Sequence, residues 1–183
     1  FTGEVIIPKK FLNTIGSYTT QEEEISLLIN DNVFTAKMGK DTVYTRIIDE
    51  KFPDYESVIP KDNDKEIKVD RKALLAAVKR VSIFSNKTTQ QVAMKTEKSK
   101  LLIATEDPEK ASKAQEELEV SYEGDPIEIG FNASYLKDVL SHINSQKIIL
   151  KLNTPISASL FYPEKNSVDE TVSMLLMPIR LNE

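Results

Sequence analysis

The apolar positions of this chain repeat as a block of one strand, one helix and three strands, and the phase stays at 62 residues over three copies. Pro8, Asp70 and Asn132 each stand at a predicted helix start. Apolar residues around these positions correspond from copy to copy as Val5/Ile67/Ile129, Ile7/Val69/Phe131, Leu12/Leu74/Leu136 and Ile15/Ala77/Val139. A constant spacing indicates one supersecondary unit that is repeated. Since one unit is too small to cover its own apolar faces, we expect units to pack against one another or against another chain.

Alternating apolar residues and turn formers predict the elements of each copy. The first copy is predicted as a strand at 4–7, a helix at 8–18 and strands at 25–29, 33–38 and 43–48. The second has a strand at 67–69, a helix that runs to residue 85 and strands at 91–96, 101–104 and 116–120. The third begins at 127, with a helix at 133–143 and strands at 147–152, 157–162 and 171–178. Proline and turn formers at 52–55 and 59–64 separate the first copy from the others. The predicted fold class is α+β, with repeated β-α-β-β-β units.

Positive charge collects on the predicted helices, although the net charge of the chain is -5. The second helix carries Arg71, Lys72, Lys79 and Arg80 and no acid, and the first helix opens on Lys9 and Lys10. Cations in a first turn oppose the helix macrodipole, so helix stability does not explain them. Lys72 and Lys79 share one helix face, along which a phosphate backbone could run. An ordinary solvated helix face would carry the same charges.

The chain offers little catalytic chemistry. His142 is the only histidine, and no serine or carboxylate stands beside it in a pattern that would activate it. The five glycines never form a phosphate-binding loop, and the absence of cysteine excludes disulfides and thiolate metal sites. The sequence therefore predicts no catalytic residues, no cofactor and no metal site. No apolar stretch approaches the roughly 20 residues that span a bilayer, so the cytoplasm is the expected compartment.

Four segments carry a resemblance to a known family. They are Phe52-Pro53-Asp54-Tyr55 with Val58 and Pro60, then Ile83-Phe84-Ser85-Asn86, Ile129 to Tyr135, and Met177-Pro178-Ile179-Arg180-Leu181. In this order they resemble the bacterial sliding clamp, the beta subunit of DNA polymerase III. The resemblance implies that residues 1–60 are the second half of the clamp middle domain and residues 61–183 the complete C-terminal domain. The chain is then expected to be a fragment without the first domain, with helices on the inner face of a ring and antiparallel sheets outside.

The resemblance also implies a function. A sliding clamp is a processivity factor in DNA replication: as a homodimeric ring it encircles duplex DNA without reading its sequence, and it tethers polymerases through a pocket for Gln-Leu-x-Leu-Phe-like peptides. The implied partners are duplex DNA, the DNA polymerase III alpha and clamp-loader subunits and other proteins with a clamp-binding motif, with no membrane and no enzymatic activity. The residues alone leave two alternatives open, a repeat scaffold that does not bind DNA and an enzyme with an unrecognised site.

Three sets of site residues follow from the resemblance. The DNA-facing residues are Lys9, Lys10, Lys72, Lys79, Arg80 and Lys137. The peptide-binding pocket has as its wall Pro53, Val58, Asn132, Tyr135, Ile156, Leu175, Leu176, Met177, Pro178, Ile179 and Arg180. Within it, Val58, Leu176 and Met177 are expected to receive apolar anchors, and Asn132, Tyr135 and Arg180 to supply polar contacts. The ring interface comprises Ile83, Phe84, Glu116 and Glu117.

Overall fold

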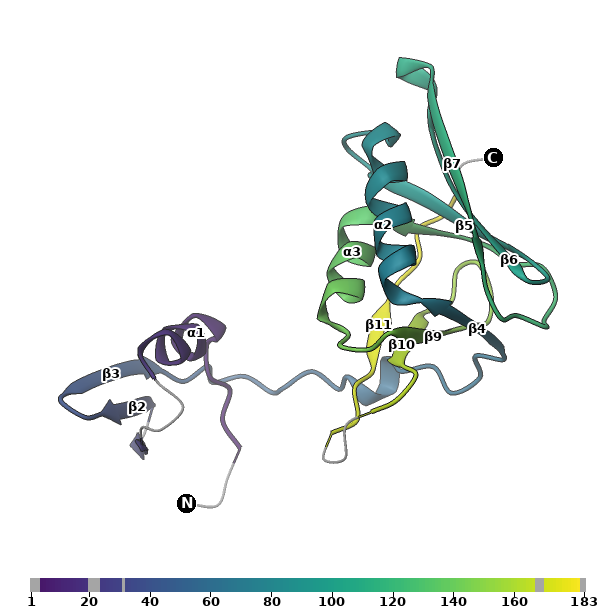
Figure 1. Cartoon of the computed structure of the whole chain (residues 1–183). Coiled ribbons are helices and arrows are strands. Elements are labelled where there is room, and N and C mark those ends of the chain that lie inside the picture. Colours follow the sequence, from purple (N-terminus) through teal and green to yellow (C-terminus); the bar gives the residue numbers. More distant parts are fainter. Residues whose placement is uncertain (1–3, 20–23, 31, 167–169, 182–183) are drawn as a thin grey trace. The chain divides into compact units, whose positions relative to one another are not determined.

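The computed structural model describes residues 4–19, 24–30, 32–166 and 170–181 of the chain (Figure 1). The chain forms two compact units, Phe1–Asp54 and Tyr55–Glu183. All strand pairs between the described residues are antiparallel, which confirms the predicted α+β class. No helix in these ranges is long and apolar enough to cross a membrane.

The first unit contains one copy of the repeat. Its elements are α1 (Lys9–Tyr18), β1 (Ile25–Asn30), β2 (Val33–Met38) and β3 (Asp41–Arg46), and the sheet order is β1-β2-β3. Phe11 and Ile15 of α1 pack against Phe34, Ala36 and Met38 of β2. The rings of Phe11 and Phe34 meet edge to face with their centroids 5.6 Å apart. This small cluster is the apolar core of the unit.

The second unit contains the other two copies. Its helical elements are η1 (Glu56–Val58), α2 (Arg71–Val81), η2 (Ser82–Phe84), η3 (Pro108–Lys110) and α3 (Ala133–His142). Its strands are β4 (Lys65–Asp70), β5 (Gln91–Glu97), β6 (Lys100–Asp107), β7 (Ser112–Glu119), β8 (Glu128–Asn132), β9 (Lys147–Leu152), β10 (Ser159–Pro163) and β11 (Met174–Leu176).

Side-chain caps set the helix starts where the sequence predicts them. Asp70 Oδ1 accepts a hydrogen bond of 2.8 Å from the Ala73 amide, and the Asn132 side chain accepts from the amides of Ser134 and Tyr135. The far end of the second helix differs from the prediction, because α2 stops at Val81 and continues as the tighter turn η2. The Ser82 and Ser85 hydroxyls donate to carbonyls three residues earlier, which stabilises such a turn.

The two copies in the second unit exchange their leading strands. β4 opens one copy but pairs with β9 of the other, in a sheet of order β11-β10-β9-β4. β8 opens the other copy but pairs with β5, in a sheet of order β7-β6-β5-β8. The outer edges of these strands form equivalent bridges, Lys68 to Ser121 and Gly130 to Ile179, and Lys68 and Gly130 are 62 residues apart. Each sheet is therefore completed by a strand of the other copy.

The core of the second unit lies where α2 and α3 meet the sheets. The two helices lie side by side (Figure 1), and Leu74 of α2 and Leu136 of α3 are both fully buried. α2 contacts β4, β6 and β7, whereas α3 contacts β8 and β11. The paired helices thus close both sheets over one core.

Leu12, the counterpart of Leu74 and Leu136, has a different environment. Its side chain is 51% exposed, whereas the other two are 0% exposed. The first unit holds only one copy, so it has no second helix of its own to cover Leu12. The strand predicted at 4–7 is wrong, since Ile6 forms only a single bridge, to Ile48. The first unit holds no second copy whose sheet this segment could complete.

The different burial of these leucines makes a stability prediction. Leu74→Ala is expected to lower the free energy of unfolding of the second unit by about 2–5 kcal/mol, since it leaves a cavity in a packed core. Leu12→Ala is the matched control at the same repeat position, and it should change the free energy of unfolding of the first unit by less than about 1 kcal/mol. Urea denaturation followed by circular dichroism checks both, and equal losses would contradict the assigned burial.

Candidate functional site

The charged face of α2 lies opposite its buried stripe. Lys72 and Lys79 are exposed, while Leu74, Val78 and Val81 are buried. Neither lysine forms an ion pair within the part of the chain that the structure describes. Both ammonium groups are thus available to an anionic ligand.

Arg80 has a different environment from these lysines. Its guanidinium donates two hydrogen bonds to the Glu116 carboxylate of β7, with 3.0 Å between Nε and Oε2. The arginine holds the pKa of Glu116 below its ordinary value. The structure therefore pairs a residue expected to face DNA with one expected at the ring interface, and the positive charge of Arg80 is already opposed.

The remaining predicted cations lie on both units. Lys9 and Lys10 are exposed in the first turn of α1, in the first unit. Lys137 is half-buried on α3, beside α2, and its Nζ lies 3.5 Å from the Ser82 hydroxyl. The second unit thus brings Lys72, Lys79 and Lys137 onto one pair of helices.

All residues of the predicted peptide wall except Pro53 belong to the second unit. The Ile179 amide donates a hydrogen bond of 2.8 Å to the Gly130 carbonyl, so the C-terminal segment runs beside β8. A Cβ atom at Gly130 would lie 2.7 Å from the Ile179 oxygen, and this close approach therefore requires glycine. The pairing brings residues 177–180 near Asn132 and Tyr135, which follow Gly130 at the start of α3.

Several wall residues expose large apolar surfaces. The exposed fractions are 58% for Met177, 65% for Tyr135 and 61% for both Val58 and Ile156. Leu176, expected to receive an apolar anchor, instead belongs to the buried core of the second unit. The Asn63 amide donates to the Lys151 and Ala158 carbonyls, which ties the segment after Val58 to the loop that carries Ile156.

The predicted ring-interface residues come together at one sheet edge. Ile83 and Phe84 on η2 are 76% and 46% exposed. The Ser112 hydroxyl donates to the Phe84 carbonyl over 3.1 Å, which fastens η2 to β7, the outermost strand of its sheet. Glu117 on the same strand forms an ion pair of 2.7 Å with Lys100. Within the described ranges β7 pairs with no strand other than β6, so this edge combines an outermost strand, exposed apolar side chains and acids.

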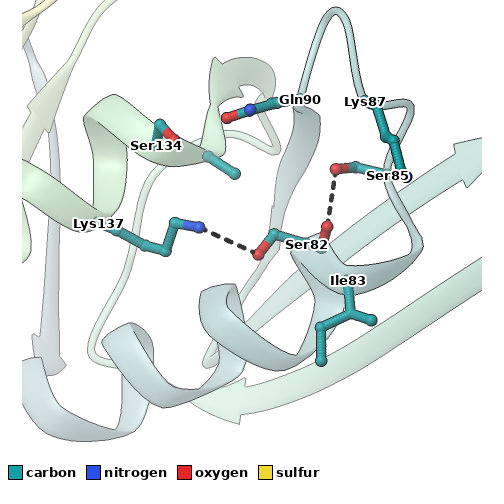
Figure 2. A pocket seen from close by; sticks show the side chains of 8 residues that line it. Ser82, Ile83, Ser85, Lys87, Gln90, Ser134 and Lys137 are labelled. Carbon is teal, nitrogen blue, oxygen red and sulfur yellow. Dashed lines mark hydrogen bonds between the residues drawn. The ribbon is translucent and has the colours of Figure 1, made fainter.

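A hollow of about 370 Å³ lies where the C-terminal end of α2 meets the N-terminal end of α3 (Figure 2). Its lining residues are Ser82, Ile83, Ser85, Lys87, Gln90, Ala133, Ser134 and Lys137. Lys137 belongs to the predicted DNA-facing set, and Ser85 and Ser134 lie in segments that carry the family resemblance, whereas no sequence pattern marks Lys87. Lys87 lies in a turn, where side-chain direction does not follow a helix or strand period.

The second unit contains a buried acid. Asp107, at the end of β6, is 0% exposed, and its Oδ2 lies 3.0 Å from Lys110 Nζ. Lys110 and, secondarily, the Asn86 side chain hold the pKa of Asp107 below its ordinary value. Asn86 in turn accepts hydrogen bonds from the Thr88 and Thr89 amides. Asp107 is thus a buried carboxylate whose charge is opposed by Lys110.

His142 is exposed, with Nδ1 3.4 Å from the Asp138 carboxylate on the same helix. No group of three or more acidic or histidine side chains within the described ranges could hold a metal ion.

Comparison with known proteins assigns this arrangement to a class, that of DNA sliding clamps. The crystal structure of the sliding clamp (DNA polymerase III subunit beta) from Pseudomonas aeruginosa bound to griselimycin matches with a TM-score of 0.87 at 34% identity, over 97% of this chain and 47% of that one. The predicted clamp fold is therefore confirmed.

Sequence relatives agree with the structural match. The beta sliding clamp of Pseudomonas putida is 35% identical over 179 residues, or 97% of this chain and 48% of that protein. That of Caulobacter vibrioides is 33% identical over 178 residues, or 97% and 47%. Residues 56–180 match the family described as DNA polymerase III beta subunit, C-terminal domain. The chain belongs to this family, and it spans about half the length of the curated relatives it matches.

The Asp107 contact predicts a pH dependence of stability. The pKa of this carboxyl lies below the ordinary value of 3.8 in the folded state. Its contribution to stability is therefore full well above pH 3.8 and is lost as the pH falls through the folded-state pKa. Asp107→Asn should lower the free energy of unfolding of the second unit at neutral pH, and the difference from the original chain should shrink below about pH 4. Urea titrations at several pH values check this, and a difference that is constant down to about pH 2 would contradict it.

Proposed function

We propose that this chain is part of a DNA sliding clamp, a processivity factor whose complete form is a homodimeric ring around duplex DNA. The observation that carries the proposal is the pair α2 and α3, which presents exposed lysines on a fold shared with sliding clamps. The chain would serve in the cytoplasm as an accessory subunit of DNA polymerase III without catalysis of its own.

Contact with DNA would be through phosphate groups. Lys72 and Lys79 are long, exposed and free of ion pairs in the described ranges, which suits them to a backbone and not to base edges. Such binding is independent of sequence and weakens steeply with salt. A ring that moves along DNA needs this kind of contact, since a base-specific contact would hold it at one register.

The peptide site would lie along the C-terminal segment and the start of α3. Its support is the exposed apolar surface of Met177, Tyr135, Val58 and Ile156. The flexible thioether of Met177 can repack around different ligands, as a site that serves several partners requires. The partners would be the alpha subunit of DNA polymerase III, clamp-loader subunits and other proteins with a clamp-binding motif.

Ring closure would use the edge formed by β7 and η2. An outermost strand with unpaired backbone groups can accept a strand of another subunit, and Ile83 and Phe84 would add apolar contact area. Residues 1–60 would then be half of a middle domain and 61–183 a complete C-terminal domain. The division between Asp54 and Tyr55 and the family match at 56–180 support this assignment.

The DNA proposal is tested with adjacent residues on one helix. Lys79→Gln should weaken binding of a short fluorescent duplex about 2–5-fold and reduce the slope of log K against log salt by about 0.9. Arg80→Gln should have a smaller effect, because Glu116 already opposes its charge. Fluorescence anisotropy at low salt measures both. Lys61→Gln, in an exposed loop, controls for net charge, and equal effects of Lys61→Gln and Lys79→Gln would count against a DNA-binding helix face.

The peptide proposal is tested with a fluorescent Gln-Leu-x-Leu-Phe-type peptide. Saturable binding is expected at ~10–100 μM, and the double variant Met177→Ala/Tyr135→Ala should abolish it, because both exposed side chains are lost. Tyr44→Ala provides a matched control, since Tyr44 is also exposed but lies in the first unit. Unchanged affinity in the double variant would refute the assigned wall.

A further inference from the structure

The hollow between α2 and α3 has an unusual charge for this chain. The sequence has 29 acidic and 24 basic residues, yet the hollow is lined by Lys87 and Lys137 and by no carboxylate. Its other polar lining comes from Gln90 and three serines. A concave site with cations, hydroxyls and an amide is chemically suited to an anion with several oxygen atoms.

Most of its side-chain donors remain available to a ligand. The Ser82 and Ser85 hydroxyls are occupied, since they donate to the Lys79 and Ser82 carbonyls. The Lys137 ammonium makes only the long contact of 3.5 Å with Ser82 among the hydrogen bonds of the described ranges. Lys87 forms no ion pair there. Figure 2 shows Lys137 and Ser134 on α3 and Lys87 and Gln90 on the facing turn.

The backbone amides at the start of α3 are not the donors. Ala133 N donates to the Gln90 carbonyl over 2.8 Å, and Asn132 accepts from the next two amides of α3. The positive end of the α3 dipole adds a favourable field, but the side chains must supply the hydrogen bonds.

The facing turn is held in place before any ligand binds. Gln90 has a φ of 50°, in the left-handed region, and two backbone hydrogen bonds of 2.8 Å, to Asn86 and Ala133, hold it there. The Asn132 side chain donates to the Thr89 carbonyl over 3.0 Å. A turn fixed at both ends loses little conformational entropy on binding.

We propose that this hollow is a seat for one phosphate group, held by Lys137 with the Ser134 hydroxyl and the Gln90 amide, while Lys87 adds positive charge at the rim. This inference rests on the proposed function, so the natural ligand is a backbone phosphate of duplex DNA. The exposed lysines of α2 would then follow the backbone, while the hollow holds a single phosphate at the far end of the helix pair.

The first experiment uses inorganic phosphate and the complete chain labelled with ¹⁵N. At constant ionic strength, saturable amide shifts are expected at residues 82–90 and 133–137. Lys137→Gln should weaken phosphate binding at least about 5-fold, whereas Lys137→Arg, which keeps the charge, should retain it. Lys61→Gln should leave binding unchanged. Lys87→Gln is a second variant in an exposed turn, in case Lys137→Gln disturbs folding.

The second experiment uses a short DNA duplex with the same variants. Lys137→Gln should reduce the salt slope by about 0.9 relative to Lys61→Gln, the loss expected for one phosphate contact. Lys79→Gln should weaken DNA binding but leave the affinity for inorganic phosphate unchanged, because it lies outside the hollow.

The outcomes separate this inference from the proposed function. Localised phosphate binding without any DNA binding would support the seat and refute the DNA function. DNA binding without localised phosphate shifts, with Lys137→Gln no different from Lys61→Gln, would overturn the seat and leave the function intact. Amide shifts spread over all surface lysines on addition of phosphate would also overturn the seat.

Discussion

The exchange of leading strands is the interaction on which the second unit depends. Because β4 completes the sheet of the third copy and β8 that of the second, neither copy can satisfy its backbone hydrogen bonds alone. The exchange places α2 beside α3 and buries Leu74 and Leu136 in one core. The shared lysine face and the hollow at the helix ends both result from this arrangement.

The proposed binding surfaces lie where elements end, and contacts distant in sequence bring them together. The bridge between Gly130 and Ile179 carries the C-terminal segment to the start of α3. The bond between Ser112 and Phe84 fastens η2 to the outermost strand. The side chains of these surfaces lie on short segments that are fastened to rigid helices and strands. The sites are therefore preorganised without long loops.

Arg80 shows where charge is an incomplete guide to function. It stands in the same run of helix cations as Lys79, but Glu116 takes up its two donor groups. The pairing could not be predicted from spacing, because Glu116 reaches α2 only through the position of β7 in its sheet. The burial of Leu176 could not be predicted from spacing either, since its place in the core depends on the pairing of β11 with β10.

The sequence by itself determined the repeat, the helix starts at Asp70 and Asn132 and the family resemblance, because local periodicity and capping act over a few residues. It also predicted that Lys72 and Lys79 share one face of the second helix. Only the tertiary structure decided the strand exchange, the exposure of Leu12, the pairing of Arg80 and the hollow with Lys87. These features depend on contacts between residues far apart in the chain, and no local pattern encodes which copy completes which sheet.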